Sequence, residues 1–295
     1  MLVHSANGEE AGFDPEFASR LDKEHALHVR ARNMTCALAL QDAALGVSPT
    51  EWRRSRFPAE LRRKITVVHE DIDTDLVRPS PTAMVRLKQG GVMLRPGDEV
   101  VTFVNRNLEP HRGFHVFMRA LPEVLRQRPK AHVVIVGGDE TSYGPPPRDG
   151  RCWREVMLAE VGARLDLDRV HFVGRVPYLS LVKLFQVSAV HVYLTYPFVL
   201  SWSLLETMSA GALVIGSRTP PVEEAVTGGV SGRLVGFHNV GALAEAITGA
   251  RADPACTEHL RRAARATVRG GSLPRPNHAP ILQPTTTGLR QGRAA

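Results

Sequence analysis

Residues 99–138 read EVVTFVNRNLEPHRGFHVFMRALPEVLRQRPKAHVVIVGG. Two valine-rich runs, 99–106 and 131–138, have the length and the β-branched composition of buried strands. Between them, residues 114–128 carry apolar side chains at the spacing of a helix that covers one face of a sheet. A strand, a helix and a second strand in this order predict a parallel β-α-β unit.

The same alternation continues toward the C-terminus. Further strands are predicted at 169–175, 189–196, 212–217 and 232–236, and further helices at 152–165, 178–188, 203–210 and 239–250. The pattern predicts an α/β domain over residues 95–267, with a Rossmann-like parallel sheet and helices on both faces. Ligands bind such sheets beyond the carboxyl ends of the strands, at the topological switch point. We therefore look for functional residues directly after each strand.

The flanking regions are less regular. Residues 1–94 predict a helix over 20–45, one short strand at 65–70 and a linker at 78–91. One or two strands are too few for a second doubly wound sheet. Residues 268–295 have no periodicity and are rich in Gly, Pro, Thr and Arg, which predicts a disordered tail.

Composition limits the class of protein. The chain has 295 residues, of which 43% are hydrophobic and 23% charged, as is usual for a soluble globular protein. Its net charge of +7 suggests an anionic partner. Nucleic acid is disfavoured, because the basic residues are spread along the chain and only 6% of residues are aromatic.

The cysteines and the hydropathy indicate a cellular location. Cys36, Cys152 and Cys256 are far apart and lack metal-ligand spacing, which fits a reducing cytosol without a disulfide framework or a zinc site. No apolar run approaches the length of a membrane span. The arginines of residues 53–63 leave open a peripheral contact with an anionic membrane face, although a solvated surface is the favoured interpretation.

Two arginines follow the first strand of the predicted sheet. Arg106 stands at the strand end, and Arg112 precedes Gly113 and the start of a helix. A helix N-terminus attracts phosphate, and two guanidinium groups beside it could hold a diphosphate. The alternative is that both arginines are ordinary solvated surface residues. The spacing alone leaves both interpretations open.

Residues 195–211, TYPFVLSWSLLETMSAG, contain a single carboxylate among apolar and hydroxyl side chains. The pattern predicts a helix from about Ser203, with Glu206 in its first turn. A carboxylate in this place could accept two hydrogen bonds from a vicinal diol such as a ribose. Alternatively, Ser203 and Glu206 form an S-x-x-E capping box that only closes the helix end. Glu206 could serve both purposes.

Two other motifs are less specific. The turn VGGDE at 136–140 lets a ligand approach the backbone at Gly138, or is only a turn, and it lacks the spacing of a dinucleotide site or a P-loop. Residues 69–76, HEDIDTDL, hold two overlapping D-x-D triplets, which bind a divalent cation in some sugar transferases. A solvated acidic turn is favoured here, so we expect neither a metal nor a cofactor.

Together these residues resemble the retaining glycosyltransferases of family 4, which have the GT-B fold, over about residues 45–265. FVNRNLEPHRGFHVFMRALPEVLRQRPKAHVVIVGGD resembles the family segment GR…P-E-K-G…L…A…VIVG. SLLETMSAGALVIGSRTPPVEEAVTGGVSGRLV is similar to LEAMACGTPVVAS…PEVV.DG.TGLLV, and VHFVGRVP resembles the F-x-G strand end. GVSPTEW and VVHEDIDT resemble the crossing between the two domains of the family.

The resemblance assigns roles to individual residues. It implies that Arg106 and Arg112 bind the donor diphosphate and that Glu206 binds the ribose. The base would lie near the strand end formed by Val173, Gly174 and Arg175. The phosphate would face the backbone N–H groups of the segment Ser201, Trp202 and Ser203.

The sequence also departs from the family pattern. The first acid of the E-x7-E motif falls on Phe198, or on Tyr196 if two residues are inserted, and neither is acidic. Trp202 is bulky for a glycine-rich position, and Asp71 replaces the usual glycine of H-E-G-I-D.

The function implied by the resemblance is transfer of a sugar from a nucleotide-diphosphate sugar to an acceptor hydroxyl, with retention and without a metal. The acceptor would be a glycan, a lipid-linked molecule or a small molecule. Residues 1–94 would be the remnant of the N-terminal GT-B domain with the interdomain linker. We therefore expect a truncated chain, and the alternative function is an inactive module that binds a nucleotide or nucleotide sugar.

Overall fold

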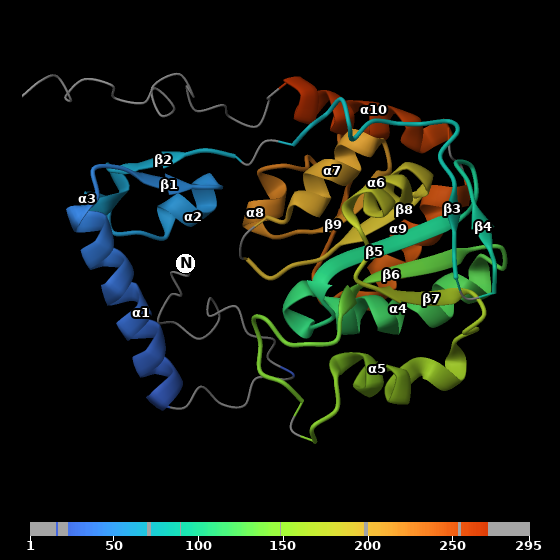
Figure 1. The fold of residues 1–295 in the computed structure, drawn as a ribbon, viewed down its shortest axis with the longest axis horizontal. Helices are drawn as coiled ribbons and strands as arrows, with labels where there is room; N and C mark the ends of the chain where they lie inside the picture. The colour runs from blue at the N-terminus through green and yellow to red at the C-terminus, as the bar shows by residue number, and fades with distance from the viewer. Residues whose placement is uncertain are drawn as a thin grey trace, which may run out of the picture.

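The computed structural model describes residue 16 and residues 23–69, 72–88, 90–147, 149–197, 200–252 and 255–270. Figure 1 shows a small N-terminal unit on the left and a larger unit on the right, built around one parallel sheet. The larger unit carries the features that the sequence analysis singled out.

The larger unit is a doubly wound α/β domain. Its strands are β5 (Val100–Asn107), β6 (His132–Gly138), β7 (Val170–Gly174), β8 (Val190–Tyr193), β9 (Leu213–Ser217) and β10 (Arg233–Val235). All pair in parallel, in the order β10-β9-β8-β5-β6-β7. The predicted Rossmann-like sheet is thus confirmed. The connection from β5 runs to β6 on one side, and the connection from β8 runs to β9 on the other, so the switch point lies between β5 and β8.

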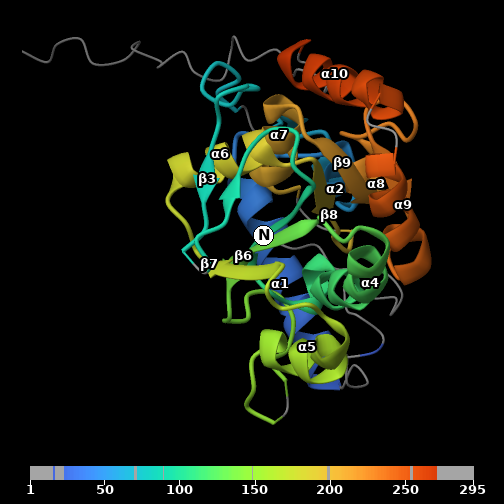
Figure 2. The same cartoon turned by 90° about the vertical axis from the view of Figure 1, so that its right-hand side faces the viewer.

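Helices cover both faces of this sheet, as Figure 2 shows. One face is covered by α4 (Phe114–Gln127), α5 (Trp153–Val161) and α9 (Val240–Ala252), and the other by α6 (Tyr178–Val187), α7 (Trp202–Ala210) and α10 (Ala255–Gly270). The short helices η2 (Pro110–Arg112), η3 (Gly162–Arg164) and α8 (Pro220–Glu223) lie in the connections.

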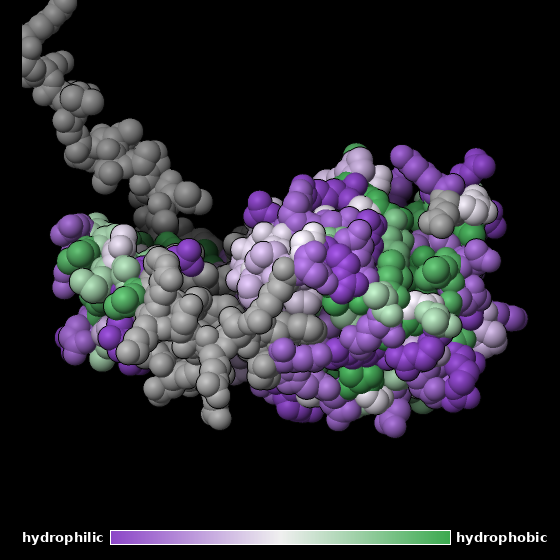
Figure 3. Space-filling model, turned by 90° about the horizontal axis from the view of Figure 1, so that it is seen from below, coloured by the Kyte–Doolittle hydropathy of each residue, from purple (hydrophilic) through white to green (hydrophobic). Residues whose placement is uncertain are grey.

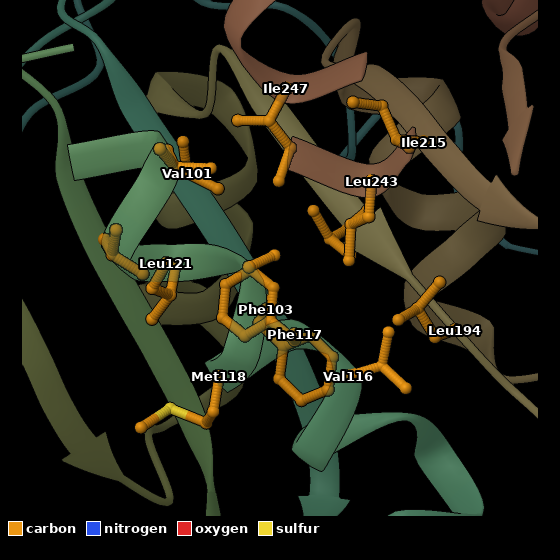
Figure 4. Packing of buried hydrophobic residues seen from close by; sticks show 14 of the residues in the cluster. Val101, Phe103, Val116, Phe117, Met118, Leu121, Leu194, Ile215, Leu243 and Ile247 are labelled. Atoms are coloured by element: carbon orange, nitrogen blue, oxygen red, sulfur yellow. The ribbon is translucent and has the colours of Figure 1, made fainter. Parts of the chain in front are cut away.

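The main core lies between β5 and α4. Phe103 of β5 stacks on Phe117 of α4, with ring centroids 4.5 Å apart and planes 9° from parallel, and Leu121 packs beside them (Figure 4). All three side chains are fully buried. Burial of one such side chain contributes about 1.5–3 kcal/mol to folding, so this contact fixes the start of α4 against the middle of β5.

The N-terminal unit is small. It consists of α1 (Lys23–Asp42), β1 (Gly46–Ser48), α2 (Glu51–Ser55), α3 (Ala59–Arg62) and β2 (Ile65–Val67), and β1 and β2 pair in parallel. Leu40, Phe57 and Ile65 form its apolar centre. Two arginines of residues 53–63 form hydrogen bonds within the unit: Arg54 donates to the Ile65 carbonyl, and Arg62 donates to the Phe57 carbonyl.

Two sequence interpretations differ from the structure. The segment 78–91 is not a plain linker, because β3 (Val85–Arg86) pairs antiparallel with β4 (Met93–Leu94), and Leu87 is buried against the sheet. Strands of two residues are too short to show alternation. Helix α10 extends to Gly270, so the first three residues of the expected tail are helical, and 271–295 lie outside the described residues.

In the part of the chain that the structure describes, no helix is both long and apolar enough to cross a membrane. In the view of Figure 3, hydrophilic residues cover most of the larger unit, and hydrophobic residues form small groups between them. Exposed apolar side chains that are scattered in this way are normal for a protein surface.

Candidate functional site

The connections that follow β5 and β8 meet at the switch point of the sheet. Strand β5 ends in a bulge: Val104 pairs with Val136 and Asn107 with Gly138, so one extra residue lies on β5. Arg106 is in this bulge and is exposed. Bulges turn side chains away from the regular ladder, and this one presents a guanidinium group at the carboxyl end of the sheet.

Arg112 is the second predicted cation, and unlike Arg106 it is buried. It is the last residue of η2, and its Nη1 donates to the Thr195 hydroxyl, 2.9 Å away, in the β8 connection. It also hydrogen-bonds to the Tyr193 hydroxyl, and its guanidinium carbon lies 5.2 Å from the centre of the Tyr143 ring. Arg112 is therefore held in a fixed place between two connections.

Gly113 lets these two connections approach each other. Its φ of 71° lies in the left-handed region, and α4 begins at the next residue. A Cβ at this position would come within 2.4 Å of the Leu194 Cβ. The backbone can thus pass directly against the end of β8, which brings the N–H groups of the first turn of α4 to the switch point.

The β8 connection is held by its own hydrogen bonds. The N–H of Thr195 donates to the Ser217 hydroxyl, and the N–H of Ser201 donates to the Tyr193 hydroxyl, 2.7 Å away. Tyr193 thus links Arg112 to Ser201, the residue directly before helix α7. Burial raises the pKa of Tyr193, so this phenol remains a neutral donor and acceptor at physiological pH.

The capping-box interpretation of Glu206 is wrong. The N-cap of α7 is Ser201, whose hydroxyl accepts a hydrogen bond from the N–H of Ser203, so α7 starts at Trp202. Glu206 therefore lies in the second turn, beyond the position that a capping box requires. Trp202 at the start of the helix is 59% exposed and does not fill the connection.

Glu206 interacts instead with the hydroxyl of Tyr178, the first residue of α6. The Glu206 side chain is buried, and burial raises its pKa, whereas the Tyr178 hydrogen bond lowers it. The pKa of Tyr178 rises to about 12, through burial first and the bond to Glu206 second. The carboxylate is thus already positioned to accept a hydrogen bond from a hydroxyl group.

The predicted base site lies at the carboxyl end of β7, which is on the side of β5 away from β8. Val173 and Gly174 end β7, and the Arg175 that follows donates to Asn107 Oδ1 at 3.0 Å and forms an ion pair with Glu140.

Gly138 belongs to the same contact. A Cβ there would lie 2.6 Å from Asn107 Oδ1 and 2.8 Å from Glu140 Oε2. Gly138 therefore makes room for the network around Arg175, and its contact with a ligand stays a prediction. At this edge of the sheet, one cluster of interacting residues thus surrounds Arg112, and a second cluster contains Gly138 and Arg175.

The structure describes one of the two positions considered for the first acid of the E-x7-E motif. Phe198 lies outside the described residues. Tyr196 packs its ring on Phe237, with centroids 4.4 Å apart, and its hydroxyl lies 3.3 Å from His238 Nε2. Tyr196 is therefore part of the apolar core on the α4 side of the sheet.

Within the acidic segment, residues 73–76 form a local turn. The Asp73 carboxylate accepts hydrogen bonds from the N–H groups of Asp75 and Leu76, the pattern of an Asx turn. Asp71 lies outside the described residues. Across the residues that the structure does describe, no three His, Cys, Asp or Glu side chains are grouped as metal ligands.

Sequence reasoning missed several residues of this edge, above all Asn107, Glu109, Tyr143 and Tyr178. Asn107 and Glu109 bond to side chains and N–H groups more than thirty positions away. The one available signal was Glu109, an acid directly before Pro110 in the short segment between a predicted strand and a predicted helix.

The doubly wound sheet, with cations and hydroxyl groups at its switch point, defines a Rossmann-like ligand-binding domain. The chain belongs to the family "Glycosyl transferases group 1", because the sequence model of this family matches residues 90–267. Residues 2–77 match a second description, "Glycosyl transferase family 4 group". The family resemblance drawn from the sequence is confirmed.

Curated relatives carry one activity in their names. The D-inositol 3-phosphate glycosyltransferase of Kribbella flavida is 27% identical over 70% of this chain and 47% of its own length. That of Acidothermus cellulolyticus is 30% identical over 81% of this chain and 56% of its own length. The chain thus spans about half the length of the curated relatives it matches.

Solved structures share the fold. HepE of Anabaena, determined with UDP and glucose, superposes with a TM-score of 0.64 at 20% identity, over 85% of this chain and 65% of its own. Sucrose-phosphate synthase of Thermosynechococcus elongatus gives 0.66 at 23% identity, over 86% and 60%. The C-terminal domain of a Francisella tularensis group 1 glycosyltransferase gives 0.57 at 16% identity, over 68% and 98%.

Proposed function

We propose that the chain binds a nucleotide-diphosphate sugar at the carboxyl ends of β5 and β8, and that its reaction is transfer of the sugar to an acceptor hydroxyl. One observation carries the proposal: the guanidinium group of Arg112 is fixed at the switch point by Thr195 and Tyr193. A cation in this place, next to the first turn of α4, suits a bound diphosphate.

Each predicted residue then has a role. Arg106 and Arg112 would hold the diphosphate, and the first turn of α7, with Ser201, Trp202 and Ser203, would face it. Glu206 would accept hydrogen bonds from the ribose. The base would lie near Val173 and the two residues after it, where Gly174 with a φ of 64° leaves space.

The chemistry follows from charge. Breaking the glycosidic bond leaves negative charge on the departing diphosphate, and fixed cations and N–H groups stabilise that charge as it develops. We propose that the two guanidinium groups supply this stabilisation, so that no metal is needed, and that the sugar keeps its anomeric configuration. A solved neighbour was determined with UDP-glucose, which makes this donor the first to test.

The acceptor is proposed to be a hydroxyl group of a glycan, a lipid-linked molecule or a small molecule. The names of the curated relatives make D-inositol 3-phosphate the first small molecule to try. Its phosphate suits a chain with a net charge of +7. Peripheral contact with an anionic membrane face remains a prediction.

The test is release of UDP from UDP-glucose, with D-inositol 3-phosphate and with neutral sugars as acceptors, with and without EDTA. We expect acceptor-dependent release that EDTA does not change, and a product with the anomeric configuration of the donor by NMR. Arg112→Met should reduce the rate roughly 100-fold if it removes one charge-assisted contact in the transition state. Arg126→Met, at the other end of α4, is the matched control. Inversion, loss of activity in EDTA, or UDP binding without release would contradict the proposal.

A further inference from the structure

The connection from β6 to α5 is long and has neither helix nor strand in its described part. Connections of this length need anchors if they are to be ordered. One oxygen of Glu109, Oε2, accepts hydrogen bonds from three successive N–H groups: Ser142 at 3.3 Å, Tyr143 at 2.9 Å and Gly144 at 3.1 Å. Three amides that converge on one anion form a nest, and here the anion belongs to the chain itself.

Glu109 itself belongs to a different connection, the one that follows β5. It lies between β5 and η2 with an extended backbone, and its side chain is 0% exposed. Its second oxygen, Oε1, is buried and has no hydrogen-bond partner in the described part of the chain. A buried carboxylate with one unsatisfied oxygen is costly, and such a group calls for an explanation beyond local packing.

The turn that Glu109 holds contains Tyr143, which contacts Arg112. The Tyr143 ring lies over the guanidinium group of Arg112 and 5.4 Å from the His111 ring. A second bond supports the same turn, because Asn107 Nδ2 donates to the Ser142 hydroxyl at 2.6 Å. Arg112 is therefore in contact both with this turn, through the Tyr143 ring, and with Thr195, through its Nη1. An aromatic face over a guanidinium group attracts it and limits its movement.

We propose that Glu109 is a positioning residue for the donor diphosphate. Its carboxylate folds the turn 142–144 against η2, so that Tyr143 holds the Arg112 guanidinium group in the place where the diphosphate binds. The gain in affinity comes from preorganisation, because Arg112 loses less conformational freedom when the ligand arrives. This inference rests on the proposed function, and it adds two residues that do not themselves touch the nucleotide.

A double-mutant cycle tests the inference by calorimetric titration with UDP. Wild type, Glu109→Ala, Tyr143→Ala and the double variant are compared. Each single variant should bind UDP roughly 10-fold more weakly, and the double variant should be no weaker than the weaker single, because both changes remove the same support. Tyr143→Phe, which keeps the ring, should recover most of the affinity that Tyr143→Ala loses.

The control is Glu99→Ala, at the opposite end of the sheet, where Glu99 pairs with Arg128. It should lower the melting temperature without changing the affinity for UDP, which separates stability from positioning. If Glu109→Ala does not fold, Glu109→Gln, which keeps one acceptor oxygen, takes its place in the cycle. Unchanged affinity in the Glu109 variant, or losses that add in the double variant, would overturn the inference alone. A folded wild type that does not bind UDP would overturn the proposed function as well.

Discussion

At Glu206 two opposing effects act on the pKa of one buried carboxyl group. Burial raises the pKa, and the hydrogen bond from Tyr178 lowers it, with burial the larger effect. The folded-state pKa is therefore above the unfolded value of roughly 4.3. The folded state holds the proton more tightly, so the free energy of unfolding falls as the pH rises from the unfolded pKa through the folded pKa.

Glu206→Gln removes this pH-dependent cost. At pH 7.5 its melting temperature should equal or exceed that of the wild type, and the difference should close at pH 4, where the wild-type carboxyl group is largely protonated in both states. Its affinity for UDP should fall roughly 10-fold, through loss of a charge-assisted hydrogen bond. Scanning calorimetry and titration calorimetry measure the two effects. A lower melting temperature at pH 7.5 with unchanged affinity would instead assign Glu206 a purely structural role.

Tyr178→Phe removes the donor that lowers the Glu206 pKa. If UDP binding requires ionised Glu206, the pH below which affinity declines should move upward in this variant. Asp73 also raises the pKa of the Tyr178 phenol, which therefore keeps its proton as a donor to Glu206 over the pH range tested. Titration with UDP between pH 5 and 8 gives the two profiles. Coincident profiles would show that the Tyr178 hydroxyl does not tune Glu206.

At the scale of elements, the approach of the β5 and β8 connections depends on Gly113. Gly113→Ala places a residue with a side chain in a left-handed backbone conformation and puts its Cβ 2.4 Å from the Leu194 Cβ. Together these two effects should lower the free energy of unfolding by about 2–4 kcal/mol. The start of α4 must also move, so the affinity for UDP should fall in the protein that remains folded.

Gly229→Ala is the control for this change. Gly229 has a similar φ of 76°, but nothing lies within 4 Å of an added Cβ. It should therefore lose only about 1–2 kcal/mol, the cost of the left-handed backbone. Urea denaturation measures both variants. Equal losses would show that the contact with Leu194 carries no energy.

The sheet could be predicted because each strand is a continuous apolar run with a helix after it, and all six predicted strands form. Strand β8 is shorter than predicted, because the N–H of Thr195 bonds to the Ser217 hydroxyl and leaves the ladder. Strands β3 and β4 and helix α10 were missed, since two-residue strands have no period and the α10 sequence was not recognised as helical.

The candidate site could be predicted only in part. Strand-end reasoning found Arg106, Arg112 and Glu206, because position along the chain is sufficient to place them. Glu109 and Tyr143 could not be found in this way, because their contact joins two separate β-α connections. Local spacing carries no information on such a contact.

At the scale of the whole molecule, the N-terminal unit is attached to the larger unit through Glu224. This carboxylate follows α8 and accepts hydrogen bonds from the N–H groups of Glu51, at 2.8 Å, and Trp52, at the start of α2. The negative charge also suits the positive end of the helix.

Glu224→Ala should therefore loosen the N-terminal unit. Amide exchange in residues 46–68 should become faster, while exchange in β5 and β6 stays unchanged, because the sheet has its own core. Glu223→Ala is the matched control, since the neighbouring Glu223 lies on α8 and is exposed, with a long contact of 3.8 Å to Arg218. Faster exchange in both variants alike would mean that α8 itself, and not the Glu224 carboxylate, maintains the contact.

The function proposed for this chain requires that the carboxyl ends of β5 and β8 bind the diphosphate of a nucleotide. Hydrogen–deuterium exchange with and without UDP tests it most directly, because it locates the ligand on the unmodified chain. We predict slower exchange at residues 105–114 and 194–207, with no change at the opposite end of the sheet around Glu99 and Arg128. Unchanged exchange in both segments at saturating UDP, or protection confined to that opposite end, would contradict the claim.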